Sequence, residues 1–61
     1  MPTIQIDMIA GRTIEQKREM VKKVTEALVS TIACKPEAVN IIVRENAKEH
    51  LAVAGKLLSD K

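Results

Sequence analysis

Pro2 follows the first methionine, and it is the residue of this chain best suited to act as a base. Methionine aminopeptidases remove Met1 when the second residue is small, which leaves the secondary amine of Pro2 at the amino terminus. An α-amino group has a reference pKa of about 7.7–8.0, and an apolar pocket or a neighbouring cation lowers it further. Such an amine can take up and return a proton near neutral pH. The alternative is that Pro2 merely precedes a strand, as in many chains that begin Met-Pro.

The groups that more commonly catalyse reactions are scarce in this sequence. The one histidine, His50, lies in the tail without evident partners, so a Ser-His-Asp set is excluded. Gly11 and Gly55 are too few for a phosphate-binding glycine loop. The single cysteine, Cys34, excludes an internal disulfide, and no second soft ligand accompanies His50, so no metal site is expected. By elimination, catalysis would rest on Pro2.

The length and composition predict a small domain that needs reinforcement. The chain has 61 residues, and we expect one domain over residues 1–61. So short a chain buries little of its own surface, and small folds are usually reinforced by disulfides, a metal or association of copies. Because 46% of the residues are hydrophobic, we expect a homo-oligomer in which apolar surface is covered between subunits.

Charge and aromatic content exclude several classes of partner. The net charge is +2 with acids and bases interspersed, which makes no nucleic-acid footprint. There is no aromatic residue on which bases could stack. No stretch approaches the roughly 20 apolar residues of a membrane span. The lone cysteine and the absence of a signal peptide favour the cytoplasm. We therefore expect no nucleic acid and no membrane partner, and any ligand steered by charge to be a small anion.

The elements that would position Pro2 can be predicted from periodicity. The first segment alternates, with Ile4, Ile6 and Met8 on one side, which is the period of a half-buried strand. A helix is predicted from Thr13, because Thr13 and Gln16 form a capping-box pattern. The apolar side of this helix is expected to contain residues at helical spacing, namely Met20, Val21, Val24, Ala27, Leu28, Thr31 and Ile32.

A second strand is predicted over residues 39–44, after Pro36 has ended the helical region. Its run Ile41-Ile42-Val43 is apolar on both faces, so we expect the helix to cover one face and another subunit the other. Two strands that flank a helix form a crossover unit with parallel strands. Residues 52–55 favour a short strand or hairpin. The expected fold is α+β: a β-α-β monomer with parallel strands and a short C-terminal hairpin arm.

Two segments together carry a resemblance to a known family. The start, from Pro2 through Gly11-Arg12-Thr13 to Glu15-Gln16-Lys17, and the later stretch 46–56 resemble the 4-oxalocrotonate tautomerase family. The resemblance covers essentially the whole chain. It implies a hexamer built as a trimer of dimers, a catalytic amino-terminal proline at Pro2, and no cofactor. It also implies that Arg12 binds a carboxylate of a small anionic substrate, which suits a permanently charged, bidentate guanidinium.

Two positions depart from the pattern of this family. The second substrate-binding arginine falls at Asn40, which can donate a hydrogen bond but supplies no charge. The phenylalanine of the pocket wall falls at Leu51, which keeps the site apolar. Arg44 lies four residues after Asn40 on the same predicted strand face, and we expect it either to replace the missing arginine in part or to form a surface or interface salt bridge.

The leading interpretation is an isomerase that resembles 2-hydroxymuconate tautomerase, an enzyme type of aromatic catabolism. Pro2 would move a proton from the 2-hydroxyl group to C-5 of an unsaturated enol acid, while Arg12 stabilises charge at a carboxylate. Hydratase or dehalogenase chemistry on unsaturated acids is the second interpretation, with a protonated Pro2 acting as an acid. A non-catalytic oligomeric scaffold is the third, and it would apply if Met1 is retained.

Overall fold

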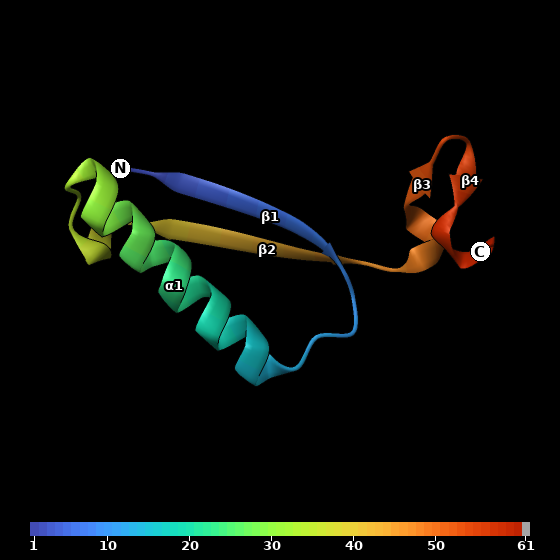
Figure 1. Cartoon of the computed structure of the whole chain (residues 1–61), viewed down its shortest axis with the longest axis horizontal. Coiled ribbons are helices and arrows are strands. Elements are labelled where there is room, and N and C mark those ends of the chain that lie inside the picture. Colours follow the sequence, from blue (N-terminus) through green and yellow to red (C-terminus); the bar gives the residue numbers. More distant parts are fainter. Residues whose placement is uncertain (61) are drawn as a thin grey trace.

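A computed structural model describes residues 1–60 as a long helix beside a two-stranded sheet, with a small arm at the far end (Figure 1). In chain order the elements are β1 (Thr3–Ile9), α1 (Ile14–Ile32), η1 (Pro36–Ala38), β2 (Asn40–Asn46), η2 (Lys48–His50), β3 (Ala52–Val53), β4 (Lys56–Leu57) and η3 (Leu58–Asp60). Here η marks a short 3₁₀ helix. The predicted β-α-β monomer with a C-terminal hairpin arm is confirmed.

The strands β1 and β2 pair in parallel, with Thr3 opposite Asn40 and Ile9 opposite Asn46. Exposure alternates from Thr3 to Met8 and from Asn40 to Arg44, as the two-residue period requires. The half-buried side of the sheet carries Ile4, Ile6, Met8, Ile41 and Val43. The predicted alternation of the first strand is therefore confirmed.

The second strand differs slightly from its predicted range of residues 39–44. Val39 does not belong to β2, because its amide donates to the carbonyl of Pro36 and closes η1. At the other end, pairing with β1 continues as far as Asn46. Ile42 is 45% exposed on the side of the sheet that α1 leaves open. One helix thus covers one face of the sheet, and this chain by itself leaves the other face uncovered.

The helix begins where the capping box predicts. The Thr13 side chain accepts a hydrogen bond from the Gln16 amide at 3.1 Å, and the Gln16 side chain accepts one from the Thr13 amide at 3.0 Å. Ala33 ends the helix in the left-handed region, with φ 55°. This conformation is uncommon for a residue with a Cβ. Cys34 and Lys35 then lead into η1 at Pro36.

The covered side of α1 is partly different from the predicted one. Met20, Val21, Val24 and Leu28 are half-buried as expected, whereas Ala27, Thr31 and Ile32 are exposed. Thr25 and Val29 are half-buried in their place, and both line a hollow of about 410 Å³ together with Pro36. Because the chain returns past the helix through η1, the covered side of α1 includes Thr25 and Val29.

The arm at the end of the chain is a tight hairpin. Strands β3 and β4 are antiparallel, with Val53 opposite Lys56 and two residues between them. Both turn residues, Ala54 and Gly55, have positive φ, of 53° and 81°. Positive φ at both central positions is what the favoured two-residue hairpin turn requires. The amide of Leu58 donates to the carbonyl of Leu51 at 2.9 Å and closes the arm.

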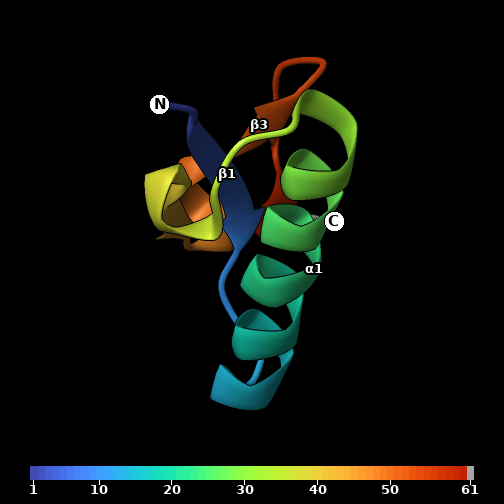
Figure 2. The ribbon, with the colours of Figure 1, turned by 90° about the vertical axis from the view of Figure 1, so that its left-hand side faces the viewer.

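Among residues 1–60 no side chain is fully buried. The chain measures 43 × 24 × 14 Å along its principal axes, and Figure 2 shows α1 lying to one side of β1. Several large apolar side chains are exposed, namely Ile14, Ile32, Ile42, Leu51, Val53 and Leu57. Within the described part of the chain, no helix is long and apolar enough to cross a membrane.

Candidate active site

Pro2 lies half-buried directly before β1. Its carbonyl oxygen accepts a 3.0 Å hydrogen bond from the amide of Asn40. The first pair of the parallel ladder, Thr3 with Asn40, follows at once. Pro2 and Asn40, which are 38 positions apart in the sequence, are therefore neighbours at one end of the sheet. Met1 precedes them with 91% of its surface exposed, so it is accessible to a processing enzyme.

Arg12 lies at the opposite end of β1, in the loop that leads to α1. Gly11 precedes it with φ 128°, a conformation that residues with a Cβ rarely adopt. Arg12 is exposed and borders a hollow of about 220 Å³, whose other lining residues are Met8, Gln16, Lys17 and Met20. The guanidinium of Arg12 and the amide of Gln16, beside two methionines, suit the carboxylate end of an organic acid with an apolar chain.

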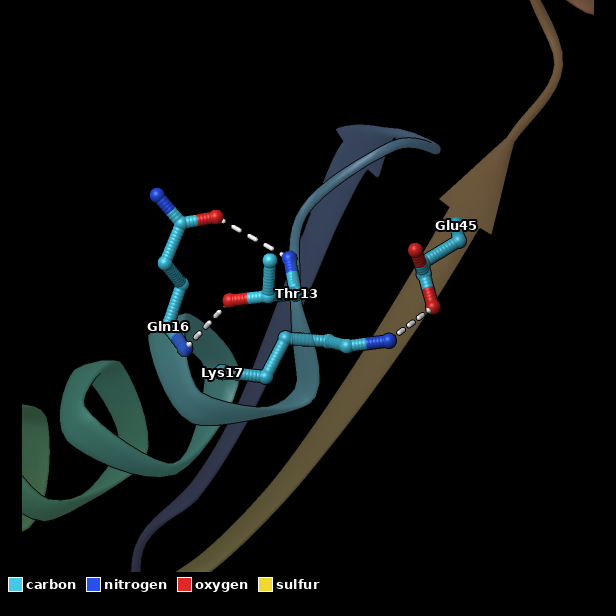
Figure 3. A network of polar contacts seen from close by, with 4 residues as sticks. All are labelled: Thr13, Gln16, Lys17 and Glu45. Atoms are coloured by element: carbon cyan, nitrogen blue, oxygen red, sulfur yellow. Dashed lines mark hydrogen bonds and ion pairs between the residues drawn. The ribbon is translucent and has the colours of Figure 1, made fainter.

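Hydrogen bonds hold the Arg12 loop on both sides. The amide of Ala10 donates to the carbonyl of Asn46 at 2.9 Å, which ties the end of β1 to the end of β2. The Thr13–Gln16 capping box holds the other side of the loop, as Figure 3 shows. Only Gly11 and Arg12 lie between these two attachments, so the main chain at Arg12 has little freedom.

The other predicted site residues are distributed along the chain. Asn40 and Arg44 are both exposed on the side of the sheet turned away from the half-buried residues, which confirms that they share a face. Arg44 stands opposite Asp7 in the sheet register. Leu51 is 39% exposed and belongs to the arm beyond the end of β2. Within one chain, the structure brings together Pro2 and Asn40 but neither Arg12 nor Leu51 with them.

The distance between the two ends of β1 decides how a shared site can form. The seven residues of β1 separate Pro2 from the Arg12 loop, and at about 3.3 Å per residue a strand of that length spans about 20 Å. A small organic acid cannot contact both residues of one chain across such a distance. A site that contains both Pro2 and Arg12 therefore requires Arg12 from a second copy.

One charged pair at this end of the molecule was not predicted from the sequence. Lys17 Nζ lies 2.6 Å from Glu45 Oε1 and joins the first turn of α1 to β2 (Figure 3). An exposed pair of Glu19 with Lys23 is also present within the helix, at 3.5 Å. The helical (i, i+4) rule indicates Glu19 and Lys23. No local rule relates Lys17 to a residue 28 positions away.

Comparisons with known proteins identify the family to which this β-α-β chain with a hairpin arm belongs. The chain belongs to the tautomerase enzyme family, whose model matches residues 2–61. The 2-hydroxymuconate tautomerase of Bacillus subtilis strain 168 is 48% identical over 60 residues, which are 98% of this chain and 97% of that relative.

Solved structures show the same fold. The crystal structure of YwhB, a homologue of 4-oxalocrotonate tautomerase, superimposes with a TM-score of 0.95 at 47% identity, covering 98% of each chain. A heterohexamer 4-oxalocrotonate tautomerase from Chloroflexus aurantiacus J-10-fl gives a TM-score of 0.93 at 27% identity, covering 98% of this chain and 97% of that one. The chain is thus a member of an enzyme family of tautomerase type.

Proposed function

We propose that this chain is the subunit of an enol–keto tautomerase that uses the amine of Pro2, free after removal of Met1, to shift a proton in an unsaturated 2-hydroxy acid. The supporting observation is the position of Pro2, half-buried directly before β1 in a chain that matches the tautomerase family from residue 2 onward. We further propose that residues 1–61 form one tautomerase domain.

The proposed reaction needs no cofactor. The neutral amine of Pro2 takes the proton from the 2-hydroxyl group, and electrons move along the conjugated chain. The resulting ammonium returns the proton to C-5, which gives a conjugated 2-oxo acid and restores the amine. Arg12 binds the carboxylate at the far end of the substrate and stabilises the charge that develops there. The preferred substrate is 2-hydroxymuconate or a similar enol acid, and the name of the Bacillus subtilis relative supports this class.

Each remaining residue has a limited role in this proposal. Asn40, beside Pro2, can donate a hydrogen bond to substrate oxygen but cannot neutralise a second carboxylate. Leu51 contributes an apolar wall from the arm of another copy, and an apolar wall keeps the amine neutral. Arg44 belongs to the site in a weaker sense, because it stands about 13 Å along the strand from Asn40.

The site is proposed to form between copies in a homohexamer arranged as a trimer of dimers. Two observations support association: Pro2 and Arg12 lie at opposite ends of β1, and no side chain among residues 1–60 is fully buried. Exposed apolar side chains on the open sheet face and on the arm, such as Ile42 and Val53, would be covered by neighbouring copies.

The test combines an intact mass with a ketonisation assay of 2-hydroxymuconate. We expect the purified protein to begin at Pro2 and Pro2→Ala to lower kcat/KM by about 100-fold, the contribution typical of a positioned acid–base group. Pro36→Ala is the matched control, since Pro36 begins η1 outside the proposed site, and it should keep wild-type activity. Equal activity of wild type and Pro2→Ala, both beginning at residue 2, would exclude the catalytic proline. Retention of Met1 in an active protein would exclude it as well.

A further inference from the structure

We propose that the Lys17–Glu45 ion pair is a positioning device for Arg12, and that it sets the affinity of the site for the substrate carboxylate. The inference rests on the proposed function, in which Arg12 binds that carboxylate. Lys17 Nζ and Glu45 Oε1 are 2.6 Å apart. The two residues come from the first turn of α1 and from β2, so the pair is a tertiary contact (Figure 3).

This ion pair differs from the others on the helix. The side chains of Lys17 and Glu45 are 24% and 32% exposed, whereas those of the Glu19–Lys23 pair are 61% and 71% exposed. Glu15 and Arg18 form a similarly exposed pair within the helix. Exposed pairs of this kind contribute little, while partly buried pairs are screened less by solvent and salt. Among the ion pairs of residues 1–60, Lys17–Glu45 is the one that joins the helix to the sheet.

The connection to Arg12 follows from two adjacent residues of β2. Asn46 accepts the hydrogen bond of Ala10, just before the loop. Its neighbour Glu45 holds Lys17, just after the loop. The end of β2 therefore fixes both sides of the segment that carries Arg12. Without Glu45, the capping box still shapes the helix start, but no ion pair or side-chain hydrogen bond in the described chain ties that start to the sheet.

Charge in the hollow supports the same role. Lys17 and Arg12 line one hollow of about 220 Å³, and two unpaired cations so close would repel each other. Pairing with Glu45 occupies the ammonium of Lys17, which leaves Arg12 as the cation that meets the substrate. Loss of Glu45 should therefore both loosen the loop and place a competing cation beside Arg12.

The principal experiment measures kcat and KM for 2-hydroxymuconate with Glu45→Gln, because Glu45 does not line the hollow. Since Arg12 binds the carboxylate of the bound substrate and also stabilises the charge that develops there, its displacement should appear both in KM and in kcat. We expect KM to rise about tenfold and kcat to fall as well. Glu19→Gln is the matched control: it breaks an ion pair of the same helix that is remote from the loop, and it should keep both constants.

A second experiment distinguishes the positioning of Arg12 from a general loss of stability. In an Arg12→Ala background, Glu45→Gln should have no further effect beyond about twofold, because the group that it positions is already absent. An equal fold-loss in both backgrounds would overturn the proposal. A lower KM in Glu45→Gln would also overturn it.

Amide hydrogen exchange and parallel assays of other variants distinguish a failure of the positioning role from a failure of the proposed function. Amide hydrogen exchange should become faster in Glu45→Gln across residues 11–17 and remain unchanged in β1, and unchanged exchange in that segment contradicts the proposal even if a variant is inactive. Wild type, Pro2→Ala and Arg12→Ala are assayed in parallel. If Arg12→Ala matches wild type, the proposed function of Arg12 is wrong. If only Glu45→Gln matches wild type, the proposed function stands and the positioning role is wrong.

Discussion

The amide of Asn40 donates a 3.0 Å hydrogen bond to the carbonyl oxygen of Pro2, so β2 begins directly beside the residue proposed as the base. The Asn40 side chain makes a longer contact of its own, with Nδ2 donating to the Ala38 carbonyl at 3.4 Å. An uncharged amide thus occupies the strand position where the resemblance to the family places a second arginine.

Asn40→Arg should shift substrate preference toward acids with two carboxylates. A guanidinium at this position adds a charged, bidentate donor that asparagine lacks. Hydrogen bonds to charged groups contribute about 1.5–3 kcal/mol, so kcat/KM for a dicarboxylate relative to a monocarboxylate should rise at least about tenfold. The ratio is measured with paired enol acids that differ in one carboxylate. Asn40→Gln, which changes length without charge, should leave the ratio unchanged. A similar ratio in Asn40→Arg would show that residue 40 does not face the substrate.

Ala33→Gly should stabilise the protein. Ala33 ends α1 with φ 55°, in the left-handed region where a Cβ is unfavourable and glycine is preferred at helix ends. We expect a gain of about 1 kcal/mol in the free energy of unfolding. The measurement is the urea midpoint of unfolding, followed by circular dichroism at one fixed protein concentration.

The same change elsewhere in the helix provides the control for Ala33→Gly. Ala27 lies within α1 and is exposed, so Ala27→Gly should destabilise by about 1 kcal/mol through the low helix propensity of glycine. A higher free energy of unfolding in Ala33→Gly together with a lower one in Ala27→Gly supports the assigned helix end. Destabilisation by both substitutions would show that Ala33 is not left-handed in the assembled protein.

The thermal midpoint of unfolding should depend on protein concentration. No side chain among residues 1–60 is fully buried, and Ile42 and Val53 are about half exposed, so the isolated chain lacks a core. Where folding is coupled to association, dilution favours the unfolded chain by mass action. Circular dichroism melts over a hundredfold range of dilution should show a steadily falling midpoint. A constant midpoint would contradict the expected coupling between folding and association.

The sequence predicts the elements well because their determinants are local. Alternation defines β1, and the Thr13–Gln16 pattern defines the start of α1. The prediction of the covered side of the helix is wrong at Ala27, Thr31 and Ile32. Helical periodicity does not indicate which side of the helix η1 packs against. The Lys17–Glu45 pair could not be predicted, since it depends on how α1 lies on the sheet.

The candidate site was predicted less completely than the fold. Pro2 and Asn40 are adjacent, as a site around Pro2 requires, but Arg12 lies at the far end of β1 and Leu51 lies on the arm. Sequence patterns identify residue types and elements, whereas the meeting of Pro2 with Arg12 depends on how separate copies associate. Whether the two residues meet is therefore tested by a measurement on the assembled protein.

The most direct test mixes two variants that are each impaired in a different residue. Pro2→Ala and Arg12→Ala are unfolded together in equal amounts, refolded, and assayed for ketonisation at substrate concentrations far below KM. If each site takes Pro2 from one chain and Arg12 from another, random association restores both residues in about a quarter of the sites, with activity in proportion. Activity no greater than the mean of the two separately refolded variants would contradict a site shared between chains.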